Sequence, residues 1–258
     1  MLRSTKEFEQ YAIAASDGVC GHVRDFYFDD HSWVIRYLVV GLGSEVGGHR
    51  ILMSPHAILS ADWPEKTFRV GLTQSEVRHS ADALTVKPVS RQHAMGYYGY
   101  DGYGKNWGGG GLWGAGFYPD ILQAGMEALE REQTSDDPRL RSANAVARYY
   151  VHASDGDIGH VSGFLVDDHS WAIRYVLVDT SNWWLGHQVI IAPEWIEDVD
   201  WAECIVSVDL SRQAVKDSPL YESERTLERE QELCTHRHYG RDGYWPRASA
   251  PGSSPPSP

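Results

Sequence analysis

The sequence predicts a mostly β protein made of two tandem small β-barrels, related by approximate two-fold symmetry, with short helical segments in a linker and in the C-terminal tail. The first observation behind this prediction is an internal repeat: residues 17–63 align without a gap with residues 155–201, and 21 of the 47 aligned positions are identical. The second is the alternation of apolar and polar side chains within each copy, which has the period of a β-strand. The third is the frequency of turn residues between short apolar runs, which is typical of small barrels.

The position of the two copies defines the expected domains. We expect the first barrel repeat in residues 1–80 and the second in residues 140–220. Residues 81–139 would join them as a linker, and residues 221–245 would form a C-terminal helical extension. The tail, residues 246–258, is rich in Ser and Pro, so we expect it to be disordered.

The linker differs in composition from both repeats. Residues 96–118 are dominated by glycines and aromatic residues. Glycine at this density predicts flexibility, and the rings would either pack loosely on the barrels or serve as a recognition tract. Residues 121–133 have the apolar spacing of a short helix.

Each strand of the second copy is indicated by its own residues. Asp155-Gly156 predicts a tight turn, because glycine tolerates a positive φ. The run Ile158–Val166 then reads as a strand with internal glycines, which indicate bulges. After a polar turn at 167–170, Trp171–Val178 alternates as a strand does. A third apolar run ends at Pro193, which cannot donate to a sheet hydrogen bond.

Three motifs recur in both copies: GHV, DDHSW and IRY, which begin at Gly21, Asp29 and Ile35 in the first copy. Together with DTSNWWLGHQVIIAPEWI in the second copy, they resemble the photosynthetic-reaction-centre (PRC) barrel family. That family includes the cytoplasmic domain of the reaction centre H subunit, the C-terminal domain of a ribosome maturation factor and many stand-alone bacterial proteins. The resemblance implies a stand-alone bacterial protein with two PRC-type barrels that is not an enzyme and that works through protein contacts.

The residues that carry this resemblance have a structural interpretation. They are Asp29, Asp30, His31, Trp33 and Arg36 in the first copy, and Asp167, Asp168, His169, Trp171 and Arg174 in the second. Two adjacent aspartates in a polar turn bond the backbone of that turn more readily than they act as an acid–base pair. The arginine can bridge to an aspartate across the hairpin and fix its register. We therefore interpret this set as mainly structural.

Only the second copy carries Asn182, Trp183, Trp184 and Leu185 between two of its strands. These apolar side chains would either cap the barrel core or, if exposed, form a hot spot for a protein partner. The four residues are therefore our candidates for a partner-binding site.

Composition excludes several kinds of partner and site. The net charge of −13 repels phosphate backbones, and no stretch reaches the ~18 apolar residues of a spanning helix, so we expect neither nucleic-acid binding nor membrane insertion. Three cysteines without a C-x-x-C pair, and an N-terminus unlike a signal peptide, indicate the cytoplasm. No nucleotide-binding or catalytic motif is present, so we expect no cofactor and no catalytic residues.

Two functional hypotheses follow. The first is a soluble, cytoplasmic, non-enzymatic protein-binding or adaptor module with an unidentified protein partner, with a homodimer left open. The second is a regulatory protein that binds a small ligand or a metal ion through the histidines that recur in both barrels. The spacing of these histidines matches no metal motif, so we assign no metal site.

Overall fold

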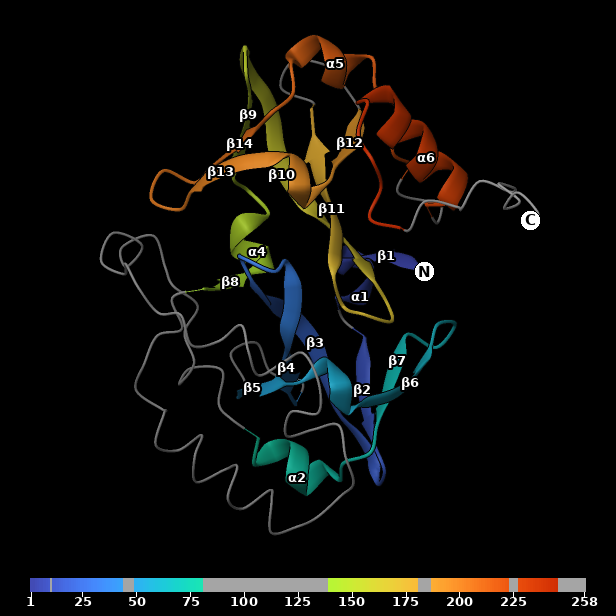
Figure 1. Ribbon diagram of the computed structural model, residues 1–258. Coiled ribbons are helices and arrows are strands. Elements are labelled where there is room, and N and C mark those ends of the chain that lie inside the picture. Colours follow the sequence, from blue (N-terminus) through green and yellow to red (C-terminus); the bar gives the residue numbers. More distant parts are fainter. Residues whose placement is uncertain (10, 44–48, 81–138, 181–186, 223–226, 246–258) are drawn as a thin grey trace, which may run out of the picture.

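The computed structural model describes residues 1–9, 11–43, 49–80, 139–180, 187–222 and 227–245. Over these residues the protein is mostly β, as predicted, with two sheets of seven strands each and short helices around them (Figure 1). Four predicted features lie outside the described residues: the Gly/aromatic tract at 96–118, the helix at 121–133, the partner-binding candidates at 182–185 and the tail at 246–258.

The main paths of the two sheets have the same strand order. The first runs β5-β4-β3-β2-β7-β6 and the second runs β12-β11-β10-β9-β14-β13. The strands of the first are β2 (Ala12–Ala15), β3 (Gly18–Asp29), β4 (Val34–Leu42), β5 (Arg50–Met53), β6 (Ile58–Asp62) and β7 (Thr67–Val70). Those of the second are β9 (Tyr150–Ala153), β10 (Gly156–Asp167), β11 (Ile173–Asp179), β12 (Gln188–Ile191), β13 (Ile196–Asp200) and β14 (Ile205–Val208). The repeat in the sequence is therefore a repeat of the fold.

Strand pairing closes neither sheet into a barrel within the described residues, since β5 and β6, like β12 and β13, end their paths unpaired with each other. The long strands β3 and β10 are nevertheless bulged: the β10–β9 register shifts between Asp157 and Gly159, and the β10–β11 register shifts between Val161 and Gly163. Gly159 has a φ of 138°, and a Cβ there would lie 2.0 Å from the carbonyl oxygen of Asp179. Only glycine fits this bend, because any side chain would collide with the neighbouring strand.

Short helices complete the described chain. They are α1 (Thr5–Phe8), α2 (Gln74–Arg78), α4 (Ala143–Val146), α5 (Arg212–Lys216) and α6 (Arg229–His238), with 3-10 turns at Pro55–Ala57 and Pro193–Trp195. The longest, α6, lies in the predicted C-terminal helical extension and packs beside the second sheet (Figure 1). Helix α2 starts with a capping box, in which Thr73 and Glu76 bond each other's backbone amides.

The two repeats exchange their first strands. Strand β1 (Leu2–Ser4) precedes the first sheet in the sequence, but it pairs antiparallel with β10 of the second. Strand β8 (Leu140–Ser142), its counterpart, pairs in the same way with β3 of the first sheet. Each sheet therefore takes its seventh strand from the other half of the chain (Figure 1).

A second contact joins the repeats where the two DDHSW turns meet. Trp33 and Trp171 both adopt a left-handed backbone, with φ of 52° and 57°. The amide of Ile35 donates to the carbonyl of Trp171 at 2.9 Å, and the amide of Ile173 donates to the carbonyl of Trp33 at 2.7 Å. These reciprocal bonds, with the bridge between Val34 and Ala172, link the two sheets directly.

One hydrophobic core runs through both repeats. The ring of Trp171, in the second repeat, packs against Phe8 and Phe68 of the first, with ring centroids 5.8 and 6.1 Å apart. Phe164 of the second repeat packs against Phe28 of the first at 5.4 Å. Because each buried aromatic side chain contributes about 2–3 kcal/mol, separating the repeats would expose part of the core of each.

Candidate functional site

We call the repeated Asp, His, Trp and Arg residues that were interpreted above as structural the signature residues. In the first repeat, the turn that they form is built around the carboxylate of Asp29. Its Oδ1 accepts hydrogen bonds from the amides of His31 (3.1 Å) and Ser32 (2.8 Å) and from the hydroxyl of Ser32 (3.0 Å). Its Oδ2 accepts from Arg36 at 3.3 Å. Burial raises the pKa of this carboxyl, but the hydrogen bonds from Ser32 and the charge of Arg36 outweigh burial and hold the pKa below its usual value. Asp29 is therefore an ionised structural group.

The second turn repeats this arrangement with a looser arginine. Asp167 accepts hydrogen bonds from the hydroxyl of Ser170 (2.8 Å) and the amide of His169 (3.1 Å). Its Oδ2 lies 3.8 Å from the guanidinium of Arg174, beyond hydrogen-bond distance. Burial again raises the pKa of Asp167, and the bonds from Ser170 and His169 again overcome it.

The second aspartate of each turn holds the exchanged strand. Asp30 pairs with Arg141 of β8 at 2.7 Å, and Asp168 lies 3.8 Å from Arg3 of β1. Each arginine also stacks on a tryptophan: Arg3 lies 3.7 Å over the ring of Trp63, and Arg141 lies 4.3 Å over the ring of Trp201. The aspartate pair of the signature thus fixes both the turn and the strand exchange.

The only group of three metal-type ligands in the described part of the chain is Asp167, Asp168 and His169, whose ligand atoms all lie within 4.8 Å of one another. Asp168 already faces Arg3 at 3.8 Å, and Asp167 lies 3.8 Å from Arg174. These cations balance the charge that a metal ion would otherwise balance, so the geometry has a structural explanation.

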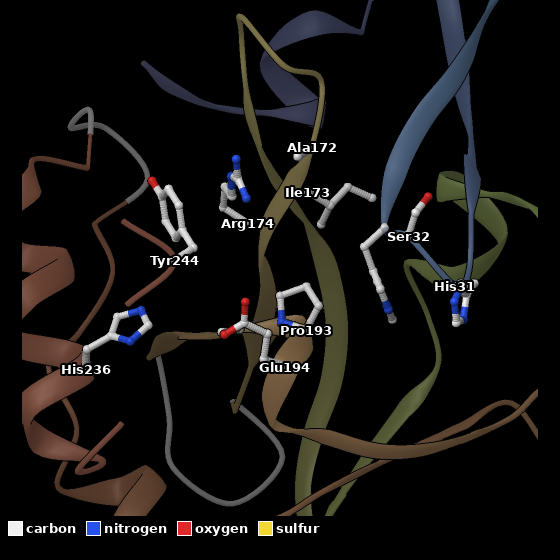
Figure 2. A pocket seen from close by; sticks show the side chains of 11 residues that line it. His31, Ser32, Ala172, Ile173, Arg174, Pro193, Glu194, His236 and Tyr244 are labelled. Atoms are coloured by element: carbon white, nitrogen blue, oxygen red, sulfur yellow. The ribbon is translucent and has the colours of Figure 1, made fainter. Parts of the chain in front are cut away.

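A pocket of about 290 Å³ lies between the two repeats (Figure 2). It is lined by His31, Ser32, Trp33, Ala172, Ile173, Arg174, Ala192, Pro193, Glu194, His236 and Tyr244. Figure 2 shows His236 and Tyr244 at one side, Arg174 and Glu194 beside them, and Ser32 and His31 across the pocket. The first repeat, the second repeat and the segment that begins with α6 each supply part of the wall.

The wall contributed by α6 rests on a buried polar network. The Tyr175 hydroxyl lies 3.0 Å from Glu232 Oε2 and 2.9 Å from His236 Nε2. Tyr244 donates to the same Glu232 oxygen at 2.9 Å, and Arg229 lies 3.2 Å from Oε1. Tyr175, Glu232 and His236 are each at most 3% exposed. Hydrogen bonds in such a site are strong, so the network fixes where α6 sits on the second sheet.

The hydrogen bonds of His236 define its protonation states. Its Nδ1 lies 2.9 Å from the carbonyl oxygen of Asp242, which can only accept, so Nδ1 carries a proton. In the neutral ring, Nε2 accepts from Tyr175; in the charged ring, Nε2 donates to Tyr175, which then donates to Glu232. Burial disfavours the charged ring and lowers the pKa of His236, and the nearby carboxylates of Glu232 and Glu194 only partly oppose this.

The candidate residues from the sequence have different outcomes. His31, Trp33 and Arg174 line the pocket, whereas the remaining signature residues build the turns and the strand exchange. The predicted partner-binding residues Asn182, Trp183, Trp184 and Leu185 lie outside the described residues.

Sequence reasoning missed Glu194, Glu232, His236 and Tyr244 as members of a site. The sequence does contain a signal for Tyr244. Residues 239–244, YGRDGY, match residues 98–103, YGYDGY, in five of six positions. This second repeated motif marks the segment that follows α6.

Comparison with known proteins identifies no family. No family model matches the chain, and no curated protein matches it. None of the helices in the described ranges is long and apolar enough to cross a membrane.

Proposed function

We propose that the protein is a cytoplasmic, non-enzymatic PRC-barrel protein that acts as a protein-binding or adaptor module. The observation that carries this proposal is that the repeated polar residues form bonds within the protein itself. The aspartates and arginines of the two DDHSW turns bond the turns and the exchanged strands. Residues so engaged build a rigid scaffold, and a rigid scaffold suits recognition by its surface.

The PRC-type barrel is part of the same proposal. Bulges in β3 and β10 bend the longest strand of each sheet, which is how a small sheet rolls towards a barrel. The identical strand order of the two sheets and the motifs GHV, DDHSW and IRY support two rolled units of one kind.

Affinity capture from the native cell tests the adaptor function. The tagged wild-type chain is compared with a variant carrying Trp183→Ala and Trp184→Ala, and with a control carrying Glu45→Ala and Val46→Ala at the counterpart positions of the first repeat. We expect a protein that is retained by the wild type and the control and lost from the tryptophan variant. Equal recovery with all three chains would contradict the proposed partner site.

The pocket favours a second candidate function, a regulatory protein that binds a small ligand. At about 290 Å³ it is close to the lower limit of about 300 Å³ for ligand pockets, and it combines apolar walls with charged groups. A metal-binding version of this candidate has a simple test: metal analysis of the purified protein should find at least one equivalent of Zn, Ni, Cu or Fe. A content below about one-tenth of an equivalent would remove it.

A further inference from the structure

The two signature arginines are not used alike, although the repeats are equivalent. Arg36 donates to Asp29 at 3.3 Å and reaches the hydroxyl of Ser32 at 3.5 Å. Arg174 makes no hydrogen bond to any described residue, and its Nε is shielded from solvent without a partner. A guanidinium has five N–H donors, so Arg174 retains donors that its counterpart has committed.

The position of Arg174 prepares it to bind a carboxylate. Its guanidinium lies 4.2 Å over the ring of Tyr244, so the ring covers one face of the group and its N–H groups point outward in the guanidinium plane. Tyr244 is itself fixed by its bond to the buried carboxylate of Glu232. A planar guanidinium held on an aromatic face binds a carboxylate through two parallel hydrogen bonds.

A free negative charge lies in the same pocket. Glu194 is exposed, lines the same pocket as Arg174 and forms no ion pair with a described cation. Figure 2 shows it next to Pro193, on the side of His236. Its carboxylate lies more than 4.0 Å from the guanidinium of Arg174, which is too far for a direct ion pair. The first repeat has His56 at the counterpart position. The pocket therefore has a cation and an anion that do not form an ion pair with each other.

Apolar side chains form the rest of the wall. Trp33 comes from the first repeat, and Ile173 and Pro193 come from the second. An aliphatic group placed between them would lose contact with water and add affinity roughly in proportion to its buried area. The site therefore offers one cation, one anion and an apolar surface.

We propose that this pocket binds a free α-amino acid with an aliphatic side chain. The carboxylate of the ligand pairs with Arg174, its ammonium group pairs with Glu194, and its side chain packs between Trp33 and Ile173. This inference rests on the small-ligand function given above as the second candidate. It does not depend on the adaptor function, which affinity capture tests separately.

Isothermal titration of the intact chain tests the inference. The probe is L-leucine, compared with N-acetyl-L-leucine, which lacks the ammonium group, and L-leucinamide, which lacks the carboxylate. We expect L-leucine to bind once per chain, and each analogue to bind at least about tenfold more weakly, because each leaves one pocket charge unpaired. Since these three titrations use the wild-type chain, they do not depend on the folding of a variant.

Substitution of Arg174 or Glu194 by glutamine then tests whether each charged side chain contributes to L-leucine binding. Arg174→Gln and Glu194→Gln should each weaken L-leucine binding by at least about tenfold. The controls Arg36→Gln, the counterpart arginine outside the pocket lining, and Glu197→Gln, an exposed carboxylate of β13, should change it less than about twofold. Circular dichroism shows whether each variant is folded.

Two results would overturn the inference. One is the absence of saturable L-leucine binding up to about 10 mM. The other is equal binding of N-acetyl-L-leucine, which would leave a small-ligand site in place but show that the ligand is a simple anion. A null titration together with partner capture would leave the adaptor function standing.

Discussion

The tryptophan that ends each DDHSW motif has an unusual backbone conformation. Trp33 and Trp171 lie in the left-handed region, which costs a residue with a Cβ about 1–2 kcal/mol. In return, the carbonyl of each accepts a hydrogen bond from the other repeat. Trp171 also buries its ring against Phe8. The cost is offset by the contact between repeats, so this tryptophan does more than start a strand.

At this scale the ion pairs of the exchanged strands differ in strength. Asp30 lies 2.7 Å from Arg141, and both side chains are nearly buried. Asp168 lies 3.8 Å from Arg3, which also bonds Glu7 at 2.8 Å. We expect Asp30→Asn to lower the free energy of unfolding by about 3 kcal/mol, because it leaves a buried arginine charge without its carboxylate. Asp168→Asn should cost less, about 1 kcal/mol, because Arg3 keeps its ion pair with Glu7. Urea unfolding measures both, and equal losses would refute the distinction.

The buried imidazole of His236 makes stability depend on pH. Because its pKa is lowered in the folded state, the unfolded chain binds a proton at pH values where the folded chain does not. Protonation below about pH 6.5 therefore favours the unfolded state, and stability falls as pH drops through this range.

The comparison with His236→Gln isolates this contribution, since the other histidines are unchanged. The wild type should be more stable than the variant at pH 7.5, and the difference should shrink towards pH 5.5. A difference that stays constant or grows as pH falls would show that His236 does not titrate as proposed.

Among the secondary-structure elements, the strands could be predicted from the sequence, but their exchange between the two sheets could not. The sequence predicts strands at Ile158–Val166 and Trp171–Val178, and these correspond to β10 and β11. The Leu-Arg-Ser tripeptides of β1 and β8 are identical, so either could pair with either sheet. Which sheet they join depends on the path of the whole chain, and local pattern carries no information about that path.

The packing of α6 was also invisible to periodicity. Its buried residues are Glu232, Thr235 and His236, which are polar and are read as solvent-facing in a hydrophobic pattern. Glu232 and His236 can be buried because Tyr175 and Tyr244 satisfy their hydrogen bonds, and the hydroxyl of Thr235 donates to the carbonyl of Gln231. A polar docking surface of this kind is found only when the two partners are seen together.

The loop that carries Trp183 and Trp184 remains a prediction from the sequence. If the rings are packed, replacing both with alanine should lower the free energy of unfolding by at least about 3 kcal/mol. If they form an exposed hot spot, stability should hardly change and partner binding should be lost. Thermal unfolding combined with affinity capture distinguishes these cases. No change in either measurement would show that the loop has neither role.

At the scale of the whole molecule, the two repeats are interlocked. Each sheet includes a strand from the other half of the chain, the two DDHSW turns share backbone hydrogen bonds, and one core crosses between them. The pocket exists because both repeats and the α6 segment meet. Neither repeat is therefore complete by itself, although the sequence divides into two similar halves.

Expressing the chain as two pieces, residues 1–80 and residues 139–258, tests this claim most directly. We expect neither piece to form a cooperatively unfolding monomer, since each lacks the strand that the other supplies and exposes part of the shared core. Mixed together, they should form a one-to-one complex with the circular dichroism spectrum and cooperative unfolding of the intact chain. If either piece alone is a monomer that unfolds cooperatively, the repeats are independent domains and the interlocked arrangement is wrong.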